Sequence, residues 1–225
     1  MTGIFGVLSF YVLAAVPAPL AIPEILPPRL DGTLDDPAWQ NAAKIGPLYL
    51  FQTNTPVNDT AIFLARDKKW LYLGFKCVNS NMTHTSQTVF KHDDAACNDD
   101  SVEVFVKPAP ADARYYHFML SFANVRKEQR CNPEGLRDGA WNPPWRSMTR
   151  RLPDGWTAEI AIPLFVFECD DLSGMQINLC RNLMKIELDR AGAKQSELHV
   201  CYAMVRPGNS GGFHDLKNFI AVSGL

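Results

Sequence analysis

Short segments in which apolar and polar side chains alternate follow one another along most of the chain. In the segment 101–107, Val102, Val104 and Val106 fall on one face and Glu103 falls on the other. Segments of this kind cover residues 61–65, 70–78, 101–107, 115–123, 156–162, 176–182, 198–204 and 219–222. They are separated by turn-forming residues, and no stretch has a long helical period. This pattern predicts antiparallel strands in two sheets packed face to face, an all-β sandwich of immunoglobulin or jelly-roll type.

One short helix is predicted near the beginning of the folded part. Asp31-Gly32 is a turn signal, and Asp36 followed by Pro37 is typical of a helix N-cap and first helical residue. The helix is expected to run through Ala43. We interpret Trp39 on its inner face as a structural plug of the sandwich.

The first 21 residues predict a signal peptide. An apolar segment of about 13 residues is followed by small residues and prolines, and it is too short to span a bilayer as a helix. No Lys or Arg precedes it, and Ala21 is the preferred cleavage site. The expected organisation is therefore a leader over residues 1–21 and one domain over residues 22–225, secreted or in the cell envelope, with no transmembrane segment after removal of the leader.

Charge and motif spacing exclude several classes of function. The formal net charge is −2, and no basic stripe of the kind that neutralises phosphates is visible, so no nucleic-acid partner is expected. A G-x-S-x-G pattern around Ser210 lacks the order of Asp and His and the strand–turn–helix setting of a hydrolase. The five histidines show no catalytic metal spacing. The chain is therefore predicted to be non-catalytic.

Several ordered motifs resemble those of the family 9 carbohydrate-binding modules and their DOMON-like relatives, over about residues 29–222. The motifs, in chain order, are Asp31-Gly32-x-Leu34-Asp35-Asp36-x-x-Trp39, Ala65-Arg66-Asp67-x-x-Trp70-Leu71-Tyr72-Leu73, Asp100-Ser101-Val102-Glu103-Val104-Phe105-Val106, Gly155-Trp156-Thr157-Ala158-Glu159-Ile160-Ala161-Ile162-Pro163, Ile177-Asn178-Leu179-Cys180-Arg181 and Phe213-His214-Asp215-x-x-x-Phe219. The resemblance implies a DOMON-like sandwich that binds a poly- or oligosaccharide and accompanies carbohydrate catabolism.

The resemblance also implies where a sugar would bind. Members of the family hold a chain end between two tryptophans, with polar side chains of the concave sheet bonded to its hydroxyls. Glu103 stands at a sugar-contacting carboxylate. The two tryptophan positions fall at Cys97, which cannot stack, and at Phe213, which can; two polar contact positions fall at Met119 and Cys180. Further polar contacts are assigned to Arg181, His214 and Asp215.

Two tryptophans of the long segment 126–146 are candidates to replace the missing platform. Trp141 and Trp145 flank two prolines, which stiffen the loop. The rings are expected either to stack on a sugar or to cover the end of the sandwich.

Structural calcium is the one cofactor that the resemblance suggests. Asp93, Asp94, Asp99 and Asp100 lie close together before a strand, and Ca²⁺ prefers six to eight oxygen ligands. Two alternatives to sugar binding stay open: a haem-binding DOMON relative that uses Met82 or His84, and a protein-interaction or structural module of an envelope assembly. The pairing of the six cysteines and the oligomeric state are left open.

Overall fold

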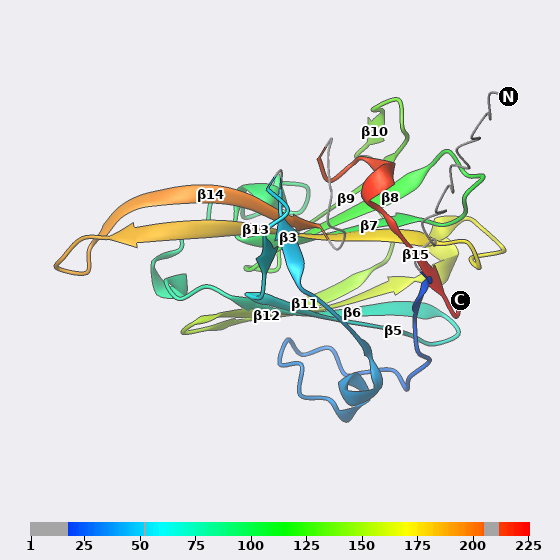
Figure 1. Cartoon of the computed structure of the whole chain (residues 1–225), viewed down its shortest axis with the longest axis horizontal. Coiled ribbons are helices and arrows are strands. Elements are labelled where there is room, and N and C mark those ends of the chain that lie inside the picture. Colours follow the sequence, from blue (N-terminus) through cyan, green and yellow to red (C-terminus); the bar gives the residue numbers. More distant parts are fainter. Residues whose placement is uncertain (1–17, 52, 205–211) are drawn as a thin grey trace, which may run out of the picture.

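The structure is a computed structural model that describes residues 18–51, 53–204 and 212–225, with residues 198–204 described by their backbone alone. Two largely antiparallel sheets lie one above the other (Figure 1). Along the larger sheet the order is β10 (Arg137–Asp138), β9 (Arg126–Cys131), β8 (Tyr115–Ser121), β7 (Ser101–Lys107), β13 (Gln176–Leu188), β14 (Lys194–Met204), β3 (Leu48–Leu50) and β4 (Pro56–Val57). Outside this order, β15 (Ile220–Ser223) pairs with the first residues of β13 and, in parallel, with β1 (Leu20–Ala21). The smaller sheet has the order β11 (Arg146–Leu152), β12 (Gly155–Pro163), β6 (Trp70–Val78), β5 (Thr60–Arg66) and β2 (Ala43–Ile45). The predicted β-sandwich is confirmed.

The main core fills the space between the sheets, as the period-two pattern predicts. Val102, Val104 and Val106 of β7 are fully buried there, and Leu73 and Phe75 of β6 belong to the same cluster. Each such side chain contributes about 1.5–3 kcal/mol when removed from water. The alternate residues of β7 therefore lie on the opposite face of the larger sheet, where the site described below is found.

The predicted N-terminal helix is present but shorter and tighter than expected. It is the 3₁₀ helix Pro37–Asn41, and the side chain of Asp36 caps it by accepting from the amide of Ala38 at 2.9 Å. It ends before Ala43 because β2 begins there and pairs with β5. The other 3₁₀ helices are Met82–His84, Ala96–Asn98, Leu164–Phe167 and Leu216–Asn218.

Glu159 of β12 anchors the N-terminal segment to the outer face of the smaller sheet (Figure 1). Its carboxylate accepts from the Trp39 indole at 2.8 Å and from the amides of Asp31 and Gly32 at 2.8 and 2.5 Å. Gly32 has φ +83°, and a Cβ there would lie 2.8 Å from the carbonyl carbon of Thr149. Trp39 is buried, in agreement with its interpretation as a structural plug.

A buried polar network joins the two sheets. The carboxylate of Asp100 accepts from the Trp156 indole and from the Asn79 amide, both at 2.8 Å, and lies 3.3 Å from a guanidinium nitrogen of Arg181. Arg181, on β13, also donates to the Thr60 hydroxyl at 2.9 Å and to backbone carbonyls of the smaller sheet. Both charged side chains are fully buried, and they pair. Contrary to the prediction, Arg181 is therefore a structural residue between the sheets and does not face a ligand.

Three features of the larger sheet and its surroundings differ from the predicted strands. The segment 126–146, expected to be a loop, contains β9 and β10. Strands β13 and β14 continue well past the predicted limits as a hairpin that projects from the body of the sandwich (Figure 1). The arginine-rich segment Arg146–Leu152, which is not among the predicted strands, forms an edge strand of the smaller sheet.

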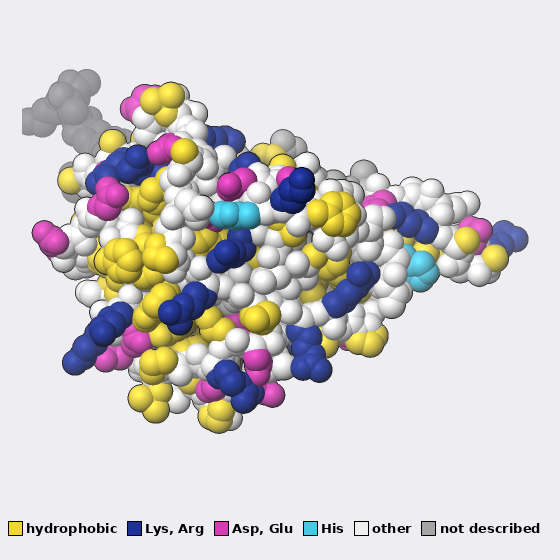
Figure 2. Space-filling view, turned by 180° about the vertical axis from the view of Figure 1, so that it is seen from behind, with side chains coloured by type: hydrophobic (Ala, Val, Ile, Leu, Met, Phe, Trp, Pro, Cys, Tyr) yellow, Lys and Arg dark blue, Asp and Glu magenta, His cyan; other side chains and the backbone are white. Residues whose placement is uncertain are grey.

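The surface carries mixed charge. Figure 2 shows one face of the molecule, on which basic and acidic side chains are interspersed among small apolar patches. In the described part of the chain, no helix combines the length and the apolar character that a membrane crossing needs. The predicted leader lies almost entirely outside the described residues, and its proposed boundary at Ala21 falls at the end of β1.

Candidate functional site

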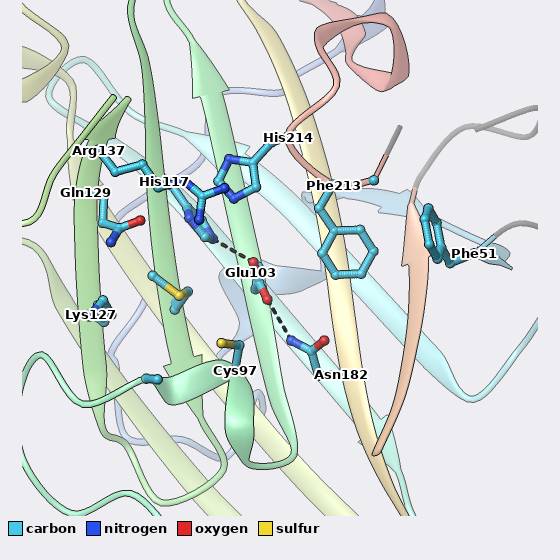
Figure 3. A pocket seen from close by; sticks show the side chains of 13 residues that line it. Phe51, Cys97, Glu103, His117, Lys127, Gln129, Arg137, Asn182, Phe213 and His214 are labelled. Atoms are coloured by element: carbon cyan, nitrogen blue, oxygen red, sulfur yellow. Dashed lines mark hydrogen bonds and ion pairs between the residues drawn. The ribbon is translucent and has the colours of Figure 1, made fainter. Parts of the chain in front are cut away.

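A pocket of about 460 Å³ opens on the face of the larger sheet that is turned away from the core (Figure 3). The strands β7, β8, β9, β10 and β13 form its floor and one wall, and segments from distant parts of the sequence complete it. Its lining residues are Phe51, Ala95, Cys97, Glu103, His117, Met119, Lys127, Gln129, Arg137, Asn182, Gly212, Phe213 and His214. Its volume lies in the range of about 300–1,000 Å³ that is typical of small-molecule sites.

Glu103 occupies the centre of the pocket and is almost fully buried. Its carboxylate is 2.6 Å from Nε2 of His117 and 2.7 Å from the amide nitrogen of Asn182 (Figure 3). Burial raises the pKa of Glu103, but His117 and the two hydrogen bonds outweigh burial and hold the pKa below its usual value. The carboxylate is therefore ionised near neutral pH and can only accept hydrogen bonds, so Nε2 of His117 carries the donated proton.

Two histidines of the pocket are held by aromatic neighbours. The His117 ring stacks on Phe105 with 4.0 Å between centroids, and its buried Nδ1 has no hydrogen-bond partner among the described residues. His214 meets the His117 ring edge-on at 4.9 Å, and its Nδ1 lies 2.9 Å from the Tyr115 hydroxyl. Burial, the neighbouring His117 and Arg137 lower the pKa of His214 to about 4, so this ring is neutral at pH 7.

Aromatic and polar side chains face each other across the pocket. Phe213 and Phe51 form one side, with ring centroids 6.3 Å apart, and both are partly exposed. Lys127, Gln129 and Arg137 lie on the opposite side, with the Glu103 carboxylate between the two groups (Figure 3).

This arrangement suits a polyhydroxylated ring. The C–H face of a sugar packs on an aromatic side chain, while its hydroxyls need donors and acceptors at fixed positions. Phe213 offers such an aromatic surface, and Glu103 offers acceptor oxygens.

The structure brings three of the predicted site residues together. Glu103, Phe213 and His214 line one pocket although they come from segments more than 100 residues apart. Cys97 and Met119, expected to stand at positions where the family has sugar contacts, lie in the same pocket as part of its apolar lining. Asp215 does not line the pocket. Its side chain caps the 3₁₀ helix Leu216–Asn218 by accepting from the Lys217 amide at 3.0 Å.

The two tryptophans of segment 126–146 lie away from the pocket and cover the core. Trp145 is 2% exposed, and its indole donates to Glu128 at 2.7 Å. Trp141 packs against the rings of Tyr116 and Phe118 at 4.8 and 5.6 Å. Of the two alternatives for these tryptophans, the second is correct: they cover the sandwich. Their packing against the core leaves little of the ring faces open to a ligand.

The four aspartates proposed as calcium ligands belong to separate hydrogen-bonding networks. Asp99 is buried and accepts from the backbone of Thr88, Asp100 belongs to the inter-sheet network, and Asp94 accepts from the amides of Phe90 and Lys91. Only Asp93 belongs to a group of converging ligand atoms, with His92 and Glu128, in the part of the chain that the structure describes. The four carboxylates therefore do not form the oxygen cluster predicted from their closeness in sequence.

The residues named for the alternative functions are also separated from the pocket. Met82 is fully buried in the core, and His84 is exposed on the 3₁₀ helix Met82–His84, so neither residue lines the pocket. Ser210 of the G-x-S-x-G pattern lies outside the described residues.

Cys77 and Cys131 are buried thiols, and burial raises the pKa of Cys77 to about 12 and that of Cys131 to about 11.

Five of the seven polar or charged side chains that line the pocket were not predicted from the sequence. His117, Asn182, Lys127, Gln129 and Arg137 were not assigned to it. For the first two a signal existed: strand alternation places His117 opposite Tyr116 and Phe118, and Asn182 opposite Arg181, on the face shared with Glu103. No comparable signal existed for the other three, since β9 and β10 carry no apolar alternation.

The fold is a β-sandwich with a pocket on the outer face of one sheet. A family model described as "Carbohydrate family 9 binding domain-like" matches residues 30–200, and the chain belongs to this family. No curated protein matches the chain at a significant level.

Solved structures share this fold at low sequence identity. A candidate carbohydrate-binding protein from Bacteroides uniformis is 16% identical, with a TM-score of 0.67, and the match covers 91% of this chain and 97% of that protein. A family 9 carbohydrate-binding module from Caldicellulosiruptor kristjanssonii, solved with glucose, is 17% identical with a TM-score of 0.52, covering 81% of this chain and 85% of the module. The same module was solved with cellotriose, at 18% identity and the same TM-score, with 84% of the module covered.

Proposed function

We propose that this chain is a non-catalytic module that binds a poly- or oligosaccharide in the pocket around Glu103. The observation that carries the proposal is the pairing of an ionised, hydrogen-bonded carboxylate with a partly exposed aromatic ring across one pocket. Membership of the carbohydrate-binding family and the sugar-bound structures of the similar module support it.

The pocket residues also favour binding over catalysis. Hydrolysis of a glycosidic bond requires two carboxyl groups about 5–10 Å apart, one of them a proton donor. Glu103 is the one carboxylate among the described lining residues, and hydrogen bonds keep it ionised. Export from the cytoplasm and association with carbohydrate catabolism are part of the proposal and follow from the predicted leader and the family resemblance.

A glycan array followed by calorimetry on the full chain tests the proposal. Phe213→Ala is expected to weaken binding of a recognised glycan by about tenfold, because an aromatic contact and its buried area are lost. Glu103→Gln should weaken it by about 10- to 100-fold, because hydrogen bonds to a charged group contribute about 1.5–3 kcal/mol.

Phe165→Ala provides the matched control. Phe165 is 72% exposed on a 3₁₀ helix outside the pocket, so its removal should leave affinity unchanged. Folded protein that binds no glycan, or binding that Phe213→Ala leaves intact while Phe165→Ala abolishes it, would overturn the proposal.

A further inference from the structure

Uncompensated positive charge lines one side of the pocket. Arg137 is exposed on β10, and its guanidinium forms no ion pair with any described residue. Lys127 of β9 lines the same side, and its ammonium group donates to the backbone carbonyl of Asp93 at 2.8 Å, a neutral acceptor. Two full positive charges therefore stand beside the cavity.

The acidic residues near these cations compensate them only in part. Glu128 alternates with Lys127 along β9, so it points to the other face and is bonded to His92 and Trp145. Asp138, next to Arg137 in sequence, pairs with Arg130 at 2.9 Å. Asp94 interacts electrostatically with Lys127, and its carboxylate accepts from the backbone amides of Phe90 and Lys91. Lys127 is therefore partly compensated, and Arg137 carries most of the excess positive charge.

Inside the pocket, the one carboxylate has its own partners. Glu103 is bonded to His117 at 2.6 Å and to Asn182 at 2.7 Å, on the floor between the cationic side and the phenylalanines. His214 is neutral at pH 7 and adds no charge there. The excess positive charge therefore lies at the side formed by β9 and β10.

From this distribution we infer that the pocket selects an anionic saccharide, one that carries a carboxylate or a sulfate on the ring it binds. This rests on the proposed function of the same pocket. The anionic group is placed on the side of the pocket that Arg137 and Lys127 line, and the sugar ring extends across Glu103 toward Phe213; Figure 3 shows the positions of these four side chains. The planar guanidinium matches either oxyanion with two parallel N–H donors, and a neutral sugar offers no charge to compensate it.

Calorimetry with matched glycans separates this inference from the proposed function. The ligands are a trimer of galacturonic acid, its carboxyl-reduced neutral counterpart and a sulfated galactose trimer. At about 50 mM salt, at least one anionic trimer is expected to bind tenfold or more tightly than the neutral trimer, and the ratio should shrink at about 500 mM salt because the charges are screened. The trimer that binds identifies the carboxylate or the sulfate as the group recognised.

Variants locate the charge that is responsible. Arg137→Gln and Lys127→Gln should each lower the ratio of anionic to neutral affinity at least several-fold, and the double variant should bring it close to one. Arg150→Gln, which removes an exposed arginine from β11 of the other sheet, should leave the ratio unchanged. If the neutral trimer binds as tightly as both anionic ones, or if the double variant keeps the full ratio, the inference is overturned and the proposed function stands. If no glycan binds to folded protein, both fall.

Discussion

Replacing Arg181 by leucine tests whether this arginine holds the sheets together. The side chain is fully buried on β13 and donates to Thr60 and to the carbonyls of Asp59 and Val78. Leucine fills part of the volume but leaves the carboxylate of Asp100 without its cationic partner. An uncompensated buried charge typically lowers the free energy of unfolding by about 3–5 kcal/mol.

The loss should be large enough to read from thermal denaturation. For a chain of this size, 1 kcal/mol shifts Tm by about 2–4 °C, so Arg181→Leu should lower Tm by about 6–20 °C. The remaining partners of Asp100, the Trp156 indole and the Asn79 amide, both at 2.8 Å, favour the lower half of that range. The assay is differential scanning calorimetry of the variant beside Arg190→Leu, which removes an exposed arginine in the β13–β14 turn and should change stability by about 0.5 kcal/mol or less.

A double variant sharpens the result. If the pair acts as a unit, adding Asp100→Asn to Arg181→Leu should cost less than the sum of the single changes, because the stranded charge is removed. A wild-type Tm for Arg181→Leu together with loss of glycan binding would refute the structural role and restore Arg181 as a ligand-binding residue.

Three further predictions concern other parts of the molecule. Trp145→Phe should lower the free energy of unfolding by about 1–3 kcal/mol, measured in urea, because Glu128 loses a buried donor, while glycan affinity stays unchanged. Glu159→Ala should expose the N-terminal segment to limited proteolysis, because the Trp39 indole and two backbone amides lose their acceptor; unchanged cleavage would contradict the anchoring role. The pKa of His214 falls from 6.5 to about 4 on folding, so the unfolded state binds more protons than the folded state between pH 4 and pH 6.5. The free energy of unfolding should therefore rise by about 1–2 kcal/mol over this pH interval, after allowance for the solvent around the ring, and stay constant at higher pH. The Tm difference between wild type and His214→Gln should follow the same course, and a difference independent of pH would refute it.

The sandwich could be predicted from the sequence because burial imposes period two on its central strands. Val102, Val104 and Val106 alternate with Glu103 as strictly in the structure as in the sequence. Strand β9 could not be predicted, because its residues are polar or charged on both faces: one face meets the pocket and the other forms ion pairs and hydrogen bonds. The same absence of an apolar pattern concealed Lys127 and Gln129 as pocket residues.

The alternation that predicts the strands also determines which side chains can reach a ligand. On β13, Arg181 falls on the same face as Ile177 and Leu179, which belong to the core, whereas Asn182 falls on the face of Glu103. The sequence analysis assigned Arg181 to the site as a polar companion of the resemblance motifs, and arginine is rarely fully buried without a partner. The partner, Asp100, lies 81 residues away in sequence, so the pair that stabilises the buried arginine is visible only in three dimensions.

The motifs that carry the family resemblance are mostly those that hold the sandwich together. Asp100, Trp156 and Arg181 belong to three different motifs and meet in one buried network, and Trp39 and Glu159 from two motifs meet in another. Such residues identify the fold because replacing any one of them leaves its buried partners without a hydrogen-bonding or ionic partner. Cys97 and Met119 lie in the pocket, together with the cations of β9 and β10, and do not belong to these two networks. The family resemblance therefore predicts the scaffold, whereas under the proposed function the preferred sugar has to be deduced from the charges that line this particular pocket.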